Sequence, residues 1–328
     1  LLGLVQLPIA INQRLTTMAR ETTVAKYLTT GDWTFGTLMN SAFLSVFLIS
    51  MSALVFAALL RKRIRAIAAV PVLLVLLVPT MINETKASLF LAPIAFLVVA
   101  IGHSSRNRGR NILVAVSAVA IFTAVFIPTY DYFMKPRWGY GILDFFTMEG
   151  RVESYLFKDA EVGTTGKVSR VDSLVLPIET LGPNPVSLTL GLGLGSVTES
   201  VFGERYTGEY YSKYGILAGP TVSRLLWELG LLGALLVFGL LFLIYKDALA
   251  LRSRTDTLGV VAHAWTAVLP VFAIGMFYKE LMSSPGLSMF FWYLSGVIAA
   301  GSAERKSIAA TPYVVRTTTA SRLRAAGG

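Results

Sequence analysis

Apolar residues gather along the chain in runs that approach the length of a membrane span. A spanning α-helix needs about 20 consecutive, mostly apolar residues. The segments that meet or approach that length are 36–60, 66–82, 87–102, 111–129, 225–245, 258–277 and 286–301. The second and third are short and contain prolines, so we expect them to be tilted, bent or partly re-entrant. The pattern therefore predicts an all-α polytopic membrane protein with about seven transmembrane helices.

The composition supports this prediction. Of 328 residues, 54% are hydrophobic and only 15% are charged, and the mean hydropathy is +0.64. Because soluble domains carry about 25% charged residues, these values exclude a soluble enzyme, a disordered protein and a coiled coil. The chain opens at Leu1 without an initiator Met or a basic stretch before an apolar one, so it does not resemble a signal peptide. We expect further natural sequence upstream.

Lysine and arginine gather in regions that alternate with the predicted spans. These regions are 61–65, 106–110, 246–254 and the tail 302–328. Since cytoplasmic loops of membrane proteins carry an excess of Lys and Arg, we expect all four regions in the cytoplasm. The net charge of +10 then reflects topology, and we expect no nucleic-acid partner.

This orientation divides the chain into five parts, which are listed here from the N-terminus. They are an extracytoplasmic amphipathic segment (1–35), a four-helix transmembrane part (36–129), a large extracytoplasmic loop (130–223), a three-helix transmembrane part (224–301) and a basic cytoplasmic tail (302–328). The first part could lie on the outer membrane surface, or it could be the end of a longer loop. The large loop far exceeds the roughly 15 residues above which unstructured connections are usually functional.

The residue types exclude several kinds of chemistry. The chain has no Cys, which excludes disulfides, thiolate nucleophiles and Cys-ligated metals. Its two histidines, His103 and His263, cannot by themselves form a histidine metal site, and no span carries a cluster of carboxylates. We therefore expect neither a metal nor a cofactor.

Charged groups at the rim of the membrane are costly, so they are candidates for function. The sequence Asn-Glu-Thr-Lys at 83–86 joins the second and third predicted spans on the outer face. We assign Glu84 and Lys86 to substrate binding; the alternative is an ion pair that caps the turn. Lys279, in the outer turn that follows the sixth span, is a further candidate for substrate binding.

Two features of the large loop have possible ligand-binding roles. Arg170 offers a rigid fork of donors that suits phosphate oxygens, although a single loop arginine is usually just solvated. The run Gly-Leu-Gly-Leu-Gly-Ser at 191–196 is similar to a nucleotide-binding loop, but no βαβ unit surrounds it. We expect close backbone approach to a ligand or tight packing there.

Arg224 and Glu228 lie four residues apart at the start of the fifth span, hence on one helix face. The cation precedes the anion, which is the weaker order for helix stabilisation. Arg224 could grip a diphosphate while Glu228 orients it or acts as a base; the alternative is an interfacial ion pair. Tyr210 and Tyr211 precede this helix and could stack on sugar rings or belong to an aromatic belt.

The run that starts at Arg224, Arg-Leu-Leu-Trp-Glu-Leu-Gly-Leu-Leu-Gly, resembles a signature of the bacterial O-antigen polymerase and O-antigen ligase superfamily. The large outer loop, the glycine run, Arg170 and the turn at 83–86 add to the resemblance, which covers roughly residues 60 to 300. It implies a metal-independent glycosyltransferase with a GT-C-like helix bundle. Such an enzyme moves glycan from an undecaprenyl diphosphate-linked oligosaccharide to an acceptor hydroxyl outside the inner membrane, in O-antigen, capsule or exopolysaccharide synthesis.

The resemblance also implies roles for individual residues. Arg170 and Arg224 would hold the diphosphate leaving group, where negative charge develops in the transition state. Ligases carry a functional histidine in the large outer loop, and this chain has none there, which favours a polymerase-like enzyme. The acceptor base is then Glu228 or another loop carboxylate. Beyond the lipid-linked substrate and the bilayer, other polysaccharide assembly proteins are candidate partners.

Other classes of protein remain as alternatives. A polysaccharide or lipid transporter would show repeated halves and charged or broken helices at the midplane, and no internal repeat occurs in the sequence. A membrane acyltransferase would need an accessible histidine on the outer side. A non-catalytic component of envelope assembly would bind the same lipid-linked glycan through the same residues, so the sequence does not separate it from an enzyme.

Overall fold

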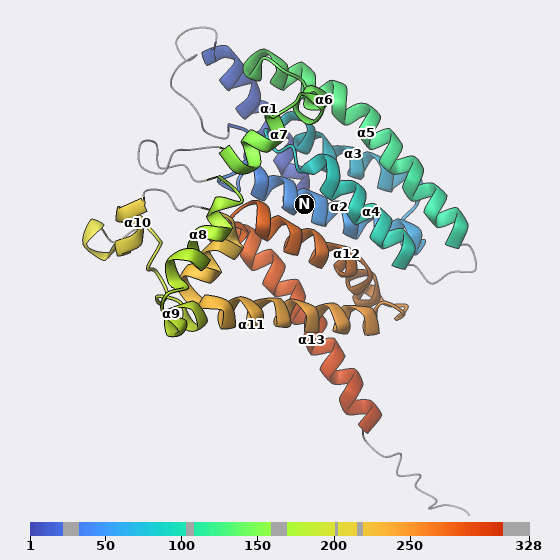
Figure 1. The fold of residues 1–328 in the computed structure, drawn as a ribbon. Coiled ribbons are helices and arrows are strands. Elements are labelled where there is room, and N and C mark those ends of the chain that lie inside the picture. The colour runs from blue at the N-terminus through green and yellow to red at the C-terminus, as the bar shows by residue number, and fades with distance from the viewer. Residues whose placement is uncertain (22–32, 103–107, 159–168, 201–202, 215–218, 311–328) are drawn as a thin grey trace, which may run out of the picture.

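The computed structural model describes residues 1–21, 33–102, 108–158, 169–200, 203–214 and 219–310, and these hold helices and no strand. Among them, the helices long and apolar enough to cross a membrane are α2 (Ser41–Leu60), α5 (Arg108–Trp138), α11 (Thr221–Leu251), α12 (Thr257–Tyr278) and α13 (Pro285–Ala310). Two shorter apolar helices, α3 (Ala66–Ile82) and α4 (Ser88–Gly102), accompany them (Figure 1). The chain is therefore a multi-pass helical membrane protein.

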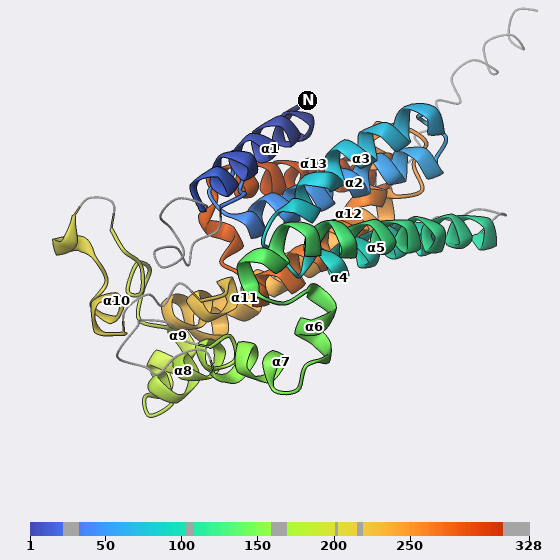
Figure 2. The ribbon, with the colours of Figure 1, turned by 90° about the horizontal axis from the view of Figure 1, so that it is seen from above.

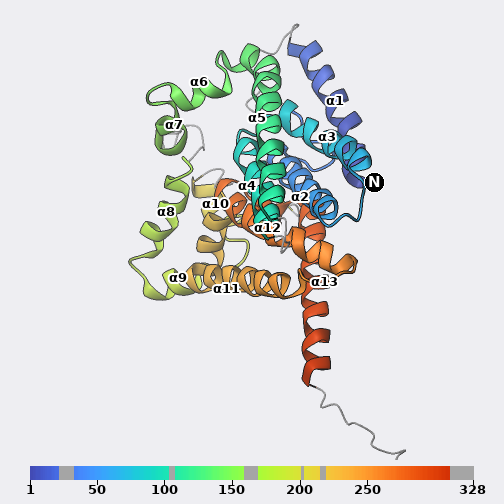
Figure 3. The same ribbon diagram turned by 90° about the vertical axis from the view of Figure 1, so that its right-hand side faces the viewer.

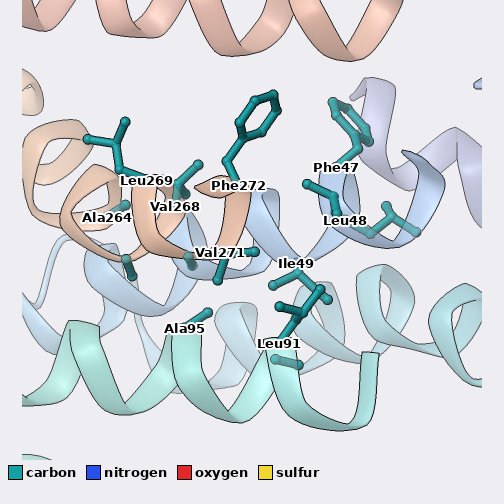
Figure 4. Packing of buried hydrophobic residues seen from close by; sticks show 14 of the residues in the cluster. Phe47, Leu48, Ile49, Leu91, Ala95, Ala264, Val268, Leu269, Val271 and Phe272 are labelled. Carbon is teal, nitrogen blue, oxygen red and sulfur yellow. The ribbon is translucent and has the colours of Figure 1, made fainter. Parts of the chain in front are cut away.

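Helices α2 and α12 form the centre of the bundle. In both, 67% of the most apolar stretch is buried inside the protein, against 17% in α5. Figure 4 shows how their side chains interlock with those of α4; the labelled residues are Phe47, Leu48, Ile49, Leu91, Ala95, Ala264, Val268, Leu269, Val271 and Phe272. By contrast, α5, α11 and α13 expose large apolar side chains, which a bilayer would cover.

Helix α1 (Leu2–Glu21) packs lengthwise against α3. Gly3 faces Leu76 in the middle of α3, whereas Arg14 pairs with Glu84 just beyond the end of that helix. Gln13 bonds to the backbone at Gly36, which ties α1 to the approach of α2. The position of this segment relative to the membrane surface stays a prediction.

Between α5 and α11 the described chain forms short helices outside the bundle of long ones (Figure 2). They are α6 (Ile142–Thr147), α7 (Arg151–Glu153), η1 (Ser154–Lys158), α8 (Asp172–Leu181), α9 (Pro185–Leu190), η2 (Glu204–Tyr206) and α10 (Glu209–Tyr214). The predicted loop boundary at residue 130 lies inside α5, because this helix continues to Trp138. Likewise α13 continues past the predicted tail boundary at 302 and projects beyond the other helices (Figure 3); residues 311–328 lie outside the described part.

Three of the four basic regions meet at one end of the bundle. Arg61 donates hydrogen bonds to the carbonyl oxygens of Arg252, at 3.0 Å, and Arg254, so the turn after α2 lies against the turn after α11. Asp247 near the end of α11 accepts a hydrogen bond from Lys306 of α13 at 3.2 Å. This arrangement is the one expected if these regions share the cytoplasmic side.

We expect cysteines at the two ends of the bundle to react from opposite sides of the membrane. The natural chain lacks Cys, so Arg63→Cys and Arg205→Cys each provide one exposed thiol. A membrane-impermeant maleimide should label Arg205→Cys in intact spheroplasts and Arg63→Cys only after permeabilisation. The opposite pattern would invert the proposed orientation.

Candidate functional site

Helix α11 is interrupted at Gly230, which divides it into residues 221–229 and 231–251. Gly230 has φ 66° and ψ −168°, a conformation open to glycine and strained for other residues. A Cβ atom there would lie 2.5 Å from the backbone nitrogen of Gly191. The second part is apolar and of spanning length, whereas the first carries Arg224 and Glu228 at the end opposite the basic regions.

The glycine run of the loop fills this interruption. The Leu192 N–H donates to the carbonyl oxygen of Trp227 at 2.8 Å, and the Gly193 N–H donates to that of Glu228 at 3.0 Å. A Cβ atom on Gly191 would lie 2.5 Å from the Glu228 carbonyl carbon. Of the two sequence-based interpretations of this run, tight packing is therefore what the structure shows, and the loop satisfies carbonyls near the break.

The Glu228 carboxylate is buried and held by three groups. Its Oε1 accepts hydrogen bonds from the Gly195 N–H at 3.1 Å and the Thr198 hydroxyl at 2.7 Å, while Oε2 pairs with Arg224 Nε at 3.2 Å. These donors offset the cost of removing the charge from water. The two side chains share one helix face and form the ion pair that was the alternative interpretation, and the roles of both in catalysis stay predictions.

Arg224 also contacts a second carboxylate. Its Nη1 lies 3.3 Å from Oε2 of Glu280, which belongs to the segment immediately after α12. About a third of the Arg224 side chain, 32%, stays exposed. The guanidinium thus bridges two elements and keeps an accessible side that could contact a ligand.

Arg170 is packed against two tyrosines. Its guanidinium carbon lies 5.1 Å from the centre of the Tyr155 ring and 4.4 Å from that of Tyr278. Nε donates to the Tyr155 hydroxyl at 3.0 Å, and Nη1 donates to the Tyr278 carbonyl oxygen. These contacts orient the side chain, so the alternative of a merely solvated loop arginine does not describe it.

The structure brings the two arginines together at the end of α12. Arg170 contacts Tyr278, and Arg224 contacts Glu280, two residues further along the same segment. A second link runs through Ser173, whose hydroxyl donates to the Arg170 carbonyl oxygen at 2.7 Å and whose own carbonyl oxygen accepts from Ser223, the neighbour of Arg224. Two arginines from different parts of the sequence are therefore both attached to the end of α12.

Lys86 adds a third cation next to this site. Its ammonium nitrogen lies 4.9 Å from the ring centre of Phe145, 5.1 Å from that of Trp138 and 5.8 Å from that of Tyr155. Because Tyr155 also contacts Arg170, one aromatic ring links the two cations. Lys86 thus lies against a ring that Arg170 also contacts, and its role in substrate binding stays a prediction.

Glu84 contacts a different part of the molecule. It is buried, with Oε1 3.8 Å from Arg14 Nη1 and Oε2 accepting from the Thr34 backbone N–H at 3.4 Å. The hydroxyl of buried Tyr130 donates to its carbonyl oxygen at 3.4 Å. These contacts join α1, α5 and the turn, and a role of Glu84 in substrate binding stays a prediction.

The remaining predicted binding residues are Tyr210, Tyr211 and Lys279, and Lys279 lies between Tyr278 and Glu280. The Tyr210 ring packs 5.6 Å from that of Trp227, while the Tyr211 hydroxyl donates to Glu199 at 3.0 Å. Burial, together with this hydrogen bond, raises the pKa of Tyr211. The Lys279 carbonyl oxygen accepts from Thr221 at 3.2 Å, which fixes the start of α11 to the end of α12. The roles of Tyr210, Tyr211 and Lys279 in substrate binding stay predictions.

Sequence reasoning missed three residues of this site: Tyr155, Tyr278 and Glu280. The rule that charged groups at the membrane rim are functional candidates would have identified Glu280, because it follows a predicted span on the outer face. Nothing comparable marks the tyrosines. His263 is buried and bonded through Nε2 to the Val99 carbonyl oxygen at 2.8 Å, far from the arginines in the bundle, and His103 lies outside the described residues.

No protein-family model matches the chain, and no curated protein and no solved structure gives a significant match. Within the described ranges, no group of three or more His, Asp or Glu side chains is placed to hold a metal ion. The fold defines the class of the protein, a multi-pass helical membrane protein, and its function has to be argued from the chemistry of the arginine site.

Proposed function

We propose that the protein is a polymerase-like glycosyltransferase of the bacterial inner membrane. It would move glycan from undecaprenyl diphosphate-linked repeat units to an acceptor sugar on the outer side, in O-antigen, capsule or exopolysaccharide synthesis. The observation that carries this proposal is that Arg170 contacts the last residue of α12 and Arg224 contacts Glu280 just after it, at the end opposite the basic regions. The resemblance around Arg224 supports the same function.

The site suits a reaction whose leaving group is a diphosphate. As the bond between the anomeric carbon and the diphosphate oxygen breaks, negative charge grows on the leaving group. Arg170 and Arg224 present planar donors that match phosphate oxygens, and the rings of Tyr155 and Tyr278 hold Arg170 in place before substrate arrives. Glu228 acts as a positioning residue, because it fixes Arg224 from the neighbouring turn of the helix.

The proposal includes a particular topology. We propose that α3 and α4 complete seven spans as short, tilted helices in a GT-C-like bundle, and that the region from α6 to α10 is extracytoplasmic. The short length of α3 and α4 fits segments that meet the bilayer obliquely or stop within it. Both helices contain prolines, which membrane helices tolerate, and Pro79 of α3 is buried against its neighbours.

A transporter or flippase is the second candidate, and the break in α11 is the observation that favours it. Transporters use interrupted helices near the midplane to bind substrate. Here the break lies near the end of the bundle, and the glycine run already occupies it. These features fit a helix that borders a binding site at the end of the bundle better than a helix that opens a transport path across the membrane.

Purified protein supplied with lipid-linked repeat units distinguishes the candidates. We expect products of increasing chain length on the lipid carrier. One transfer to a different acceptor would instead indicate a ligase, movement across the bilayer without transfer would indicate a transporter, and binding alone would indicate a non-catalytic assembly component. A reaction without the protein controls for spontaneous hydrolysis of the donor.

We expect transfer to be insensitive to metal chelation. The leaving-group charge is assigned to arginines, and the chain has no Cys and only two His with which to build a tight site. Activity after dialysis against EDTA should equal that of the untreated enzyme. An activity lost on chelation and restored by one divalent ion would contradict this expectation.

A further inference from the structure

Glu280 carries an unusual carboxylate. Its Oε2 pairs with Arg224, but Oε1 is buried and accepts no hydrogen bond from the residues that the structure describes. Only 16% of the side chain is exposed. Buried carboxylate oxygens are normally satisfied, so an oxygen left open beside a pair of arginines needs an explanation. One explanation that fits the site is that this oxygen accepts the proton of a substrate hydroxyl.

The comparison with Glu228 decides which carboxylate is available. Glu228 uses both oxygens, one for the Gly195 amide and the Thr198 hydroxyl and the other for Arg224. A group that must accept a proton from substrate needs a free lone pair within hydrogen-bond reach of it. A carboxylate has about four lone-pair sites, and Glu228 fills three of them, whereas Oε1 of Glu280 accepts no bond from the described residues. Glu280 is therefore the more available proton acceptor, although the two share Arg224 as a partner.

We propose that Glu280 is the general base for the acceptor; this inference rests on the proposed function. In the step, Oε1 of Glu280 takes the proton of the acceptor hydroxyl while the hydroxyl oxygen bonds to the anomeric carbon of the donor. The bond from that carbon to the diphosphate oxygen breaks, and its electron pair leaves with the diphosphate. Atoms and charge balance without any further reactant.

The surrounding contacts place Glu280 suitably for this step. Arg224 holds Oε2, which turns the other oxygen away from the ion pair. Arg170 bonds to Tyr278, two residues before Glu280, so one of the cations assigned to the leaving group is attached to the same short stretch of chain as the base. The Leu281 N–H donates to the Thr221 hydroxyl at 2.8 Å, which fixes the backbone directly after Glu280 against the start of α11.

The test uses Glu280→Gln and Glu280→Ala in the full chain, with chain elongation as the readout. We expect Glu280→Gln to bind lipid-linked donor normally but to elongate it about 100-fold to 10,000-fold more slowly, as when a general base is lost. We expect the rate of the natural enzyme to rise with pH on the acidic side, as for any carboxylate base, and this rise to disappear in Glu280→Gln. Added formate should partly restore Glu280→Ala, since a small carboxylate can take the vacated place.

Glu204→Gln is the matched control, because Glu204 is an exposed carboxylate of the same loop and should elongate normally. If Glu280 only positions Arg224, the slow variants will keep the pH dependence and formate will not rescue them, which overturns the assignment. If Glu280→Gln elongates the donor at the natural rate, the assignment of Glu280 as the base is also wrong, while the proposed function stands. If the natural protein itself elongates no donor, both proposals fail.

Discussion

Replacing Arg170 or Arg224 by alanine should reduce glycan transfer by about 30-fold to several hundredfold per folded protein. Loss of one donor aimed at developing charge costs roughly 2–4 kcal/mol of transition-state stabilisation, and each 1.4 kcal/mol corresponds to about tenfold in rate. Both side chains are held by contacts within the protein, so little reorganisation accompanies their action. The measurement is polymer yield against time, normalised to monodisperse protein.

Lysine substitutions separate charge from geometry at the same positions. Arg224→Lys keeps a positive charge but loses the planar fork, so we expect intermediate activity. Arg205→Ala is the control for the loss of one arginine, because its side chain is exposed and lies next to Tyr206, away from the shared site. If both alanine variants transfer at nearly the natural rate, the diphosphate binds elsewhere.

Gly191→Ala and Gly230→Ala should strongly reduce the amount of folded protein. Both glycines have positive φ, +75° and +66°, which costs roughly 1–2 kcal/mol with a side chain. In each case the new Cβ would lie 2.5 Å from the backbone of the opposite segment, and such overlap adds roughly 1–3 kcal/mol. Since whole domains are stable by only about 5–15 kcal/mol, we expect a clear fall in melting temperature in detergent.

Gly239→Ala provides the matched comparison within the same helix. A Cβ there meets nothing within 4 Å, and the residue is helical and exposed. It should leave the melting temperature unchanged or raise it slightly, because alanine favours helix over glycine. Equal melting temperatures for Gly230→Ala and Gly239→Ala would show that the contact between α11 and the glycine run contributes little.

The features that were predicted best are those that depend on the local pattern of residues, such as helix bounds and helical spacing. The predicted segment 66–82 coincides with α3, and the Arg224–Glu228 pair follows from helical spacing alone. The break at Gly230 was not predicted, since a glycine among leucines is common in membrane helices and its conformation depends on contact with residue 191. Similarly, the assignment of Lys86 rested on its place at the rim, but its neighbours Phe145 and Tyr155 come from a distant loop.

Contacts across long stretches of sequence explain most of what could not be predicted. Glu84 pairs with Arg14 of α1, and Arg170 pairs with the end of α12, and neither partner is marked by spacing or composition. Glu280 is marked by its place at the membrane rim, but its pairing with Arg224 is not predictable from the sequence. Burial and hydrogen bonding, which distinguish Glu280 from Glu228, have no counterpart in a one-dimensional pattern.

The order of the contacts has a consequence for biosynthesis. The glycine run at 191–196 bonds to residues 227–228, and Arg170 bonds to residue 278, so each loop element depends on a helix that the ribosome makes later. Membrane insertion proceeds from the N-terminus, and the loop therefore emerges before its partners exist. A chain that stops before α12 is complete would carry the entire loop without an assembled arginine site. The contacts of the glycine run therefore form only after the start of α11 has been made, and the contact of Arg170 with Tyr278 only after α12 has been made.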